Sequence, residues 1–274
     1  MQLIVRNRVH IAACATAGAW AWGSLLGCTP SALDLIEVAA VVLCTYQWNR
    51  LTDAREDAIN CPDELAVALA NRRLIEMTCI ALLGVIAVVA VVEASGAKTI
   101  LLGISLSLAF CYGAPVRLKS IFLVKNLSSA FGWTLLTVIY PALDIIPLGN
   151  PALLLAFACM LGAVIVVELL WDLRDVDGDA AAGIRSLPVV AGRRTTLVAL
   201  FFVNSVPALL VLIGITTHVL RISWVFVLIN TALVFLMLIV FGDDFSGARR
   251  RWTHILVMTQ SLLLVGLGAV AHRV

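Results

Sequence analysis

The sequence predicts an all-α polytopic membrane protein, with nine transmembrane helices around a central cavity. Two features of its composition lead to this fold class: of 274 residues, 62% are hydrophobic and only 13% are charged. One soluble core cannot bury that much apolar surface. A third feature selects helices, because the long apolar runs are apolar on every side and lack the alternation of membrane β-strands.

Nine apolar runs are separated by short polar stretches, and a helix of about 20 residues crosses a hydrocarbon layer of about 30 Å. In chain order the predicted spans cover residues 9–27, 32–48, 74–92, 99–112, 127–146, 152–171, 196–219, 223–241 and 254–271. The first is rich in Gly and Ala, and the fourth is short. No room is left for a soluble domain, so residues 1–274 are expected to form a single transmembrane domain surrounded by membrane lipid.

The basic residues lie mainly on one side of these spans. If the N-terminus is cytoplasmic, 16 of the 19 Lys and Arg residues face the cytoplasm, before the first span and after the second, fourth, sixth and eighth. Only Lys98, Arg221 and Arg273 lie on the other side. The positive-inside rule therefore places the N-terminus inside and the C-terminus outside. The basic residues sit in short loops among carboxylates, so no nucleic acid partner is expected.

Cysteine and histidine give no sign of a metal or disulfide site. The seven cysteines include no CxxC pair and lie mostly in or beside apolar spans, as packing residues do. The four histidines are scattered without ligand spacing, so a zinc site is not expected.

An acidic segment follows the second predicted span. In it, Asn49, Asp53 and Asp57 are spaced i, i+4 and i+8. On a helix that continues out of the span, this spacing places all three side chains on one face, about one turn apart.

A second acidic segment follows the sixth span, where Asp172, Asp175 and Asp179 also share a helical face. Both segments follow even-numbered spans and so belong to the same membrane surface. Crowded carboxylates repel one another unless a cation lies between them, and Mg²⁺ binds such oxygens together with substrate phosphates. The metal ligands predicted are Asn49, Asp53, Asp57, Asp172, Asp175 and Asp179.

Basic side chains on the same surface are candidates for neutralising the phosphates. They are Arg117, Lys119 and Lys125, with Arg193 and Arg194 farther along the chain. The alternative is that charged loops serve only solubility. That alternative explains too little, because nine of the 17 acidic residues fall in the two acidic segments.

The two acidic segments also suggest an internal repeat. Asp53 and Asp175 are 122 residues apart, and each lies just past the second span of a four-span unit. A basic stretch follows the fourth span of each unit, the second being Arg249–Arg251. The fold would then be two four-helix repeats plus one helix, with a cavity between the halves.

Three motifs, in this order along the chain, make it similar to the UbiA superfamily of intramembrane prenyltransferases. Asn49, Asp53 and Asp57 match the NxxxDxxxD pattern, followed by Asn60 and Pro62. The stretch from Tyr112 through Pro115, Arg117 and Lys119 resembles the family's Tyr-Ser-x-Pro-x-Arg-Leu-Lys segment, with Lys125 and Asn126 following. Asp175 and Asp179 match DxxxD, and nine spans is the family's number.

The resemblance implies Mg²⁺-dependent ionisation of an isoprenoid diphosphate and prenyl transfer to an acceptor inside the membrane, a step of terpenoid biosynthesis. Asp53, Asp57, Asp175 and Asp179 would hold the metal, and Asn49 would support it. Lys119, with Arg117 or Lys125, would receive the diphosphate. Tyr112 would belong to the diphosphate site, and Asp172 is shared with only some branches of the family.

Two departures from the family pattern bear on the substrates. Many members have Asp directly after the first Asn and Arg after Pro-Asp, where this chain has Arg50 and Glu64. The acceptor class therefore does not follow from the resemblance. The superfamily also includes terpene cyclases, which are carbon–oxygen lyases that ionise the same substrates, and cyclisation stays open as the alternative activity.

Several other residues have two possible roles. Aromatic side chains near the cytoplasmic ends of the spans either stabilise a carbocation or form the interfacial belt, and the belt is favoured for any single one. They are Tyr46, Trp48, Tyr112, Trp133 and Trp171. Glu37, Glu76 and Glu168 lie within spans, and Glu168 shares a face with Asp175. A cation-coupled transporter is disfavoured, because the carboxylates lie at one membrane face.

Overall fold

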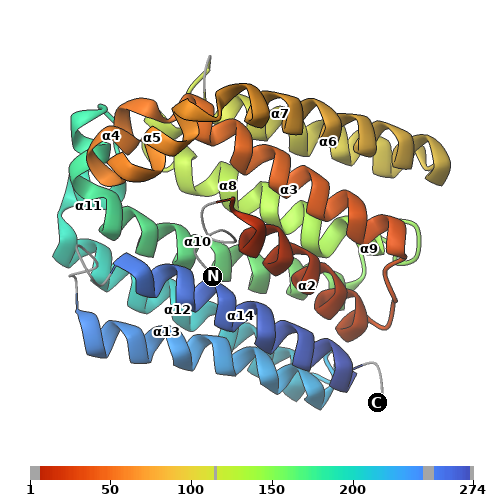
Figure 1. Ribbon diagram of the computed structural model, residues 1–274. Helices are drawn as coiled ribbons and strands as arrows, with labels where there is room; N and C mark the ends of the chain where they lie inside the picture. Colours follow the sequence, from red (N-terminus) through yellow and green to blue (C-terminus); the bar gives the residue numbers. More distant parts are fainter. Residues whose placement is uncertain (1–6, 114–115, 243–249, 272–274) are drawn as a thin grey trace.

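The computed structural model describes residues 7–113, 116–242 and 250–271, and within these ranges it contains helices and no strand. The long helices run side by side in one bundle, and the short helices α4, α5 and α11 gather at one end of it (Figure 1). Ala114 and Pro115 of the middle motif and Arg249 of the second basic stretch lie outside the described residues. The same holds for residues 1–6 and 272–274.

The first part of the chain forms four long helices, and the first acidic segment lies between the second and the third of them. The helices are α2 (Val9–Leu26), α3 (Ala32–Thr52), α4 (Ala54–Asn60), α5 (Pro62–Ala70), α6 (Arg72–Glu93) and α7 (Gly96–Tyr112). Local signals set the boundaries. Gly27 ends α2 in the left-handed region with φ 78°. Ser31 and Asp34 form a capping box at the start of α3, with Asp34 N–H donating to Ser31 Oγ at 3.0 Å.

The rest of the described chain contains an interrupted helix followed by four long ones, α10, α12, α13 and α14. The helices are η1 (Leu118–Ser120), α8 (Val124–Thr134), η2 (Leu135–Ile139), α9 (Tyr140–Ala142), α10 (Pro151–Ala181), α11 (Leu187–Ala191), α12 (Arg193–Thr216), η3 (Ile222–Phe226), α13 (Val227–Phe241) and α14 (Arg250–Ala271). Pro141 interrupts the predicted fifth span: it has no N–H to donate to Thr137, and the helix widens to a π-turn at η2 just before it.

Among the described residues, six helices are long and apolar enough to cross a membrane. They are Val9–Leu26, Arg72–Glu93, Pro151–Ala181, Arg193–Thr216, Ile222–Val240 and Trp252–Val270. Large apolar side chains also face outward from the bundle, with Val91 78% and Ile239 80% exposed, as lipid contact requires. The chain is therefore an integral multi-pass membrane protein.

The count of nine spans stays a prediction, as does the internal repeat. The other three predicted spans are helical, but each is shorter, more charged or less regular than these six helices. Helix α3 carries Asp34, Glu37 and Arg50, α7 has only 17 residues, and the segment from α8 to α9 changes its pitch.

Small residues hold the first and last helices of the bundle together. Ala15, Ala19 and Ala21 of α2 are fully buried, and a side chain at Gly268 of α14 would clash with the Trp20 ring at 2.5 Å. Helix α2 thus packs closely on α14 and on η2, and these two chain ends form one wall of the interior.

Candidate active site

The first acidic segment keeps the geometry that its spacing predicts, although its helix is interrupted. Asp53 ends α3 and precedes α4, but the backbone bonds continue: Asp53 N–H donates to Asn49 O, and Asp57 N–H to Asp53 O, both at 2.9 Å. Asn49, Asp53 and Asp57 therefore stay one turn apart, and all three line one cavity.

The second acidic segment is the end of a long helix and not a loop. Helix α10 runs on for ten residues past Trp171, the end of the predicted span, and carries Asp172, Asp175 and Asp179. These three side chains line the same cavity as Asn49. The shared helical face predicted for Asp172, Asp175 and Asp179 is therefore present, and the helix continues beyond the predicted membrane span.

Asn60 joins the two acidic segments. Its Nδ2 donates to Asp175 O at 3.4 Å, and its Oδ1 accepts from Gly178 N–H at 3.2 Å. A Cβ on Gly178 would lie 2.2 Å from Asn60 Nδ2, so only glycine allows this approach. The contact holds α4 against α10. Asn60 directly follows the first acidic motif in the sequence, but no spacing marks Gly178 as its partner.

Two buried lysines neutralise the carboxylates. Lys119 Nζ contacts Asp53 Oδ1 and lies 2.5 Å from Glu56 Oε1. Lys125 Nζ lies 2.7 Å from Asp172 Oδ1 and 2.6 Å from Asp179 Oδ2. Each lysine thus bridges two acidic side chains at the cavity wall.

Two arginines, Arg174 and Arg117, form further ion pairs with acidic residues of the two segments. Arg174 binds Asp175 through two bonds, of 3.0 and 2.5 Å, and lies over the Trp171 ring at 5.4 Å. Arg117 does not line the cavity; it lies 3.4 Å from Glu56, behind Lys119. Glu56 therefore links both basic residues, a role that its spacing did not reveal.

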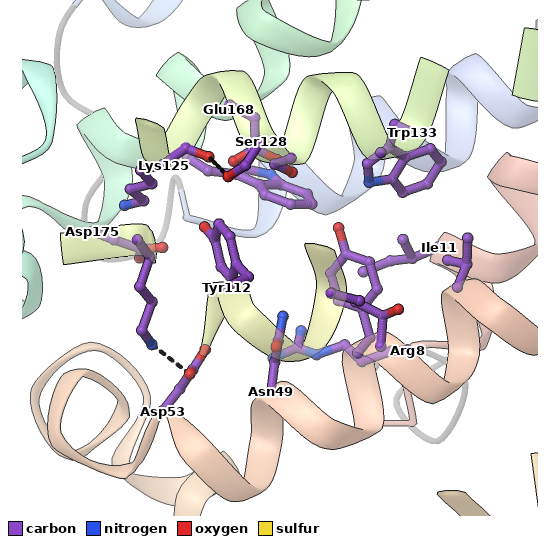
Figure 2. A pocket seen from close by; sticks show the side chains of 18 of the residues that line it. Arg8, Ile11, Asn49, Asp53, Tyr112, Lys125, Ser128, Trp133, Glu168 and Asp175 are labelled. Carbon is purple, nitrogen blue, oxygen red and sulfur yellow. Dashed lines mark hydrogen bonds and ion pairs between the residues drawn. The ribbon is translucent and has the colours of Figure 1, made fainter. Parts of the chain in front are cut away.

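The cavity that these groups surround has a volume of about 210 Å³ and is rich in charge (Figure 2). Among the described residues, seven carboxylate side chains line it: Asp53, Glu56, Asp57, Glu168, Asp172, Asp175 and Asp179. Five described Lys or Arg side chains do so: Arg8, Arg50, Lys119, Lys125 and Arg174. Carboxylates outnumber these cations, which suits additional positive charge.

Burial raises the pKa values of the carboxyl groups in the first acidic segment. The pKa of Asp57 rises to about 6, mainly through burial, while the Cys61 thiol hydrogen bond opposes the rise and the nearby Asp53 adds to it. The pKa of Asp53 is also raised by burial, against the opposing effect of Lys119. Burial lowers the pKa of the Lys125 ammonium, but Asp172 and Asp179 outweigh it and the net pKa is raised. All three shifts reflect charge held out of bulk water.

A second, apolar cavity of about 390 Å³ adjoins the first. Its wall comes mainly from α2, α10, α13 and α14, and side chains shared with the polar cavity separate the two: Ile11, Tyr46, Trp133, Glu168 and Trp171. Tyr46 meets Trp133 and Trp171 edge to face, each at 6.4 Å between ring centroids. A charged head and an apolar chain of one ligand therefore find adjoining spaces.

The family model described as "UbiA prenyltransferase family" matches residues 9–265. The chain belongs to the UbiA prenyltransferase family. Comparison with curated protein sequences gives no match.

Solved UbiA structures share this fold. A UbiA homolog from Archaeoglobus fulgidus bound to GPP and Mg²⁺ is 18% identical, with a TM-score of 0.74 and full coverage of both chains. The apo UbiA homolog from Aeropyrum pernix K1 is 16% identical, with a TM-score of 0.75 over 97% of this chain and 99% of that one. A digeranylgeranylglyceryl phosphate synthase is 15% identical, with a TM-score of 0.66 over 99% of this chain and 98% of the other.

The UbiA-family motifs of this chain offer a donor set that fits Mg²⁺. Asn49 Oδ1 is buried at the cavity and has no hydrogen-bond donor, so a neutral oxygen is available next to the Asp53 and Asp57 carboxylates. In the described part of the chain, no three acidic, His or Cys side chains converge closely enough to hold an ion as they stand. The lysines and Arg174 engage the carboxylates instead.

Most predicted site residues come together at this UbiA-type cavity. Asn49, Tyr112, Lys119 and Lys125 line it, together with the five aspartates predicted as metal ligands: Asp53, Asp57, Asp172, Asp175 and Asp179. Arg117 stands behind it. Trp48 packs on Phe110, with ring centroids 5.2 Å apart, and does not line either cavity.

Proposed function

We propose that this protein transfers a prenyl group from an isoprenoid diphosphate to an acceptor within the membrane, as a prenyltransferase that requires Mg²⁺. The observation that carries the proposal is the pair of adjoining cavities, one lined by carboxylates and lysines and one almost wholly apolar. A diphosphate matches the first and an isoprenoid chain the second.

Asn49, Asp53 and Asp57 would hold Mg²⁺ from α3 and α4, and Asp172, Asp175 and Asp179 from α10. When bound, Mg²⁺ supplies Lewis-acid stabilisation of the charge that develops on the departing diphosphate. The UbiA homologs of known structure with bound GPP or DMAPP and Mg²⁺ support this assignment.

The lysines would exchange partners when the substrate binds. Lys119 and Lys125 leave the carboxylates and donate to diphosphate oxygens. Arg117 stays paired with Glu56 and so orients the carboxylate beside Lys119. Tyr112 lines the cavity together with the two lysines.

The reaction places its carbocation at the junction of the two cavities. The C1–O bond of the prenyl diphosphate breaks, the bonding pair leaves with the diphosphate, and the acceptor's nucleophilic atom forms the new bond to C1. The acceptor's proton passes to the released diphosphate. Tyr46, Trp133 and Trp171 exclude water there, and their π faces favour positive charge.

The proposed orientation places the polar cavity at the cytoplasmic side. The 16 to 3 distribution of basic residues supports it. The short helices α4, α5 and α11 lie together at one end of the bundle, as expected if both acidic segments face one membrane surface (Figure 1).

The test is turnover of geranyl, farnesyl and geranylgeranyl diphosphates by purified protein with Mg²⁺, analysed by mass spectrometry with and without candidate acceptors. Substrate consumed only with an acceptor supports the transferase. A cyclic hydrocarbon or terpene alcohol formed without acceptor establishes the cyclase instead. Full activity in EDTA refutes the metal–diphosphate mechanism.

Matched variants identify the site. Asp53→Asn and Asp175→Asn are expected to abolish turnover, because each removes a charged metal ligand from one half of the site. Asp177→Asn is the control: Asp177 lies on α10 between two site residues, but its side chain is exposed and does not line the cavity. Wild-type rates in either site variant would contradict the assignment.

A further inference from the structure

A pair of carboxamide side chains interrupts the wall of the apolar cavity. Gln260 Nε2 of α14 donates to Asn230 Oδ1 of α13 at 2.7 Å, and both side chains line the cavity. They are the only carboxamides among the described residues that do so. A prenyl chain is a pure hydrocarbon without a hydrogen-bonding atom, so it makes no use of this pair.

The pair lies at the centre of two candidate membrane spans. Asn230 is the ninth of the 19 residues of Ile222–Val240, and Gln260 is the ninth of the 19 residues of Trp252–Val270. At this depth of a bilayer neither water nor a lipid headgroup supplies hydrogen bonds, so polar side chains are costly unless they have partners. The partners must come from the protein or from a lipid-soluble ligand.

The single hydrogen bond between the two amides leaves most of their capacity unused. A carboxamide has two N–H donors and an oxygen that can accept two hydrogen bonds. Neither side chain makes another hydrogen bond in the described part of the chain. The pair therefore offers Asn230 N–H groups to a carbonyl oxygen in the cavity, and Gln260 Oε1 to a hydroxyl group.

Hydrogen bonds of amide side chains also hold transmembrane helices together, and Asn204 shows such a structural contact. Its Nδ2 donates to Thr231 O at 3.0 Å and so joins α12 to α13. Asn204 is only 2% exposed and lines neither cavity. Asn230 directly precedes Thr231, yet its side chain lies at the cavity wall, where a ligand can reach it.

The apolar cavity extends to the lipid-facing surface beside the pair. Ile229 of α13 and Leu262 of α14 line it and are also 40% and 76% exposed. These two helices run side by side along one edge of the bundle (Figure 1). A ligand dissolved in the bilayer can therefore reach the amides without crossing the charged cavity.

The pair is close enough to the polar cavity for one ligand to reach both. From His254, which lines the polar cavity, to Gln260, helix α14 rises about 9 Å. Tyr46, Trp133 and Trp171 separate the two cavities, and the proposed carbocation forms beside them. A ligand about 9 Å long can contact the amides with one end and this junction with the other.

We infer that Asn230 and Gln260 bind an uncharged oxygen, a carbonyl or a hydroxyl, of a lipid-soluble acceptor that enters between α13 and α14. The inference rests on the proposed prenyl transfer and names the chemical class of the second substrate. The two amides take part in no bond change. They are positioning residues, which direct the other end of the acceptor toward C1 of the prenyl group.

Equilibrium binding to the purified full-length protein in lipid nanodiscs tests this inference, with the diphosphate site filled by geranyl thiolodiphosphate and Mg²⁺. Two pairs of uncharged probes differ in one oxygen. They are 2-naphthol with 2-methylnaphthalene for a hydroxyl, and 1-tetralone with tetralin for a carbonyl. Dissociation constants are referred to the probe concentration in the lipid, so that differences in partitioning cancel.

At least one oxygen-bearing probe is expected to bind about tenfold or more tightly than its hydrocarbon counterpart, because it gains a hydrogen bond that the lipid does not offer. The double variant Asn230→Leu with Gln260→Leu is expected to abolish that preference while changing the affinity for the thiolodiphosphate by less than about threefold. Both amides are replaced together, because one alone would be left unpaired. Thr259→Val is the matched control: it removes a hydroxyl of α14 that lines neither cavity, and is expected to keep the preference.

Three results would overturn the inference. The first is equal binding of the oxygen-bearing and hydrocarbon probes to the wild type. The second is a double variant that keeps the preference, even if it melts at a lower temperature, because the pair would then only join the helices. The third is an oxygen-bearing probe that binds only without the thiolodiphosphate, because an acceptor must bind beside the donor.

Two further measurements keep the test decisive. If the double variant does not fold, the single variants Asn230→Leu and Gln260→Met replace it, and an unchanged preference in both refutes the inference. Mg²⁺-dependent binding of the thiolodiphosphate is measured separately, so its absence rejects the proposed function and not the amide site.

Discussion

The Asn60–Gly178 contact predicts how the two halves of the site depend on each other. In Gly178→Ala, the new Cβ would lie 2.2 to 2.6 Å from three side-chain atoms of Asn60, so the Asn60 side chain must swing away or α4 and α10 must separate. Overpacking of this kind costs about 1–3 kcal/mol. The loss of both Asn60 hydrogen bonds adds about 0.5–1.5 kcal/mol for each. The higher helix propensity of alanine stabilises the variant by only about 1 kcal/mol, so net destabilisation is expected.

Thermal unfolding in detergent, with turnover measured on the same sample, checks this prediction. Gly178→Ala is expected to lower the melting temperature and to reduce turnover by about 10²-fold, since a shift of about 1 Å at catalytic groups has that effect. Gly84→Ala is the matched control: nothing lies within 4 Å of its added Cβ, and it is expected to be neutral or stabilising.

A double variant separates the clash from the lost bonds. Asn60→Ala with Gly178→Ala removes every side-chain atom that would clash, so the pair is expected to be no less stable than Asn60→Ala alone. The reasoning is refuted if Gly178→Ala is as stable and active as the wild type, or if the two substitutions destabilise additively.

Three other predictions follow from the site and the topology. Lys119→Met is expected to lower kcat by about 10²-fold with a smaller effect on KM, as for loss of one preorganised donor; normal kcat in folded protein would shift the role to Lys125. The pKa of about 6 for metal-free Asp57 means that protons compete with Mg²⁺ below that pH. Mg²⁺ affinity, measured by calorimetry, is therefore expected to fall between pH 7 and pH 5, and an affinity independent of pH in this range would be inconsistent with Asp57 as a ligand. Cysteines introduced near Glu64 and Ala181 in a cysteine-free background are expected to resist labelling from outside intact cells, and efficient labelling at either position would reverse the proposed topology.

Local periodicity explains why much of the site could be predicted. Asn49, Asp53 and Asp57 share a face wherever the backbone is helical, and the break at Asp53 leaves the i to i+4 bonds intact. The even-numbered spans then bring two such faces to one end of the bundle. Neither inference requires knowledge of side-chain packing.

The contacts between segments could not be predicted in the same way. Arg174 is adjacent to Asp175 in sequence, but only the structure shows the two bonds between them. Glu56 had no spacing that marked it as a partner of Lys119. Pro141 marks the interruption of the fifth span in the sequence. The span is nevertheless predicted as continuous, because its residues are mostly apolar. These features arise where distant helices meet, and tertiary packing decides them.

The ion pairs of the site explain why substrate and metal are expected to bind together. Lys119 and Lys125 neutralise carboxylates in a cavity where unpaired charge is costly. In the proposed function these carboxylates would hold Mg²⁺, and the two ammonium groups would exchange them for phosphate oxygens. Each ligand would thus give a partner to the charged groups that binding of the other ligand alone would leave unpaired. By linkage, Mg²⁺ must raise the affinity for the diphosphate by the same factor as the diphosphate raises the affinity for Mg²⁺. Under the proposed function the lysines would be counter-ions before binding and ligands after it, and the site would stay close to charge balance in both states.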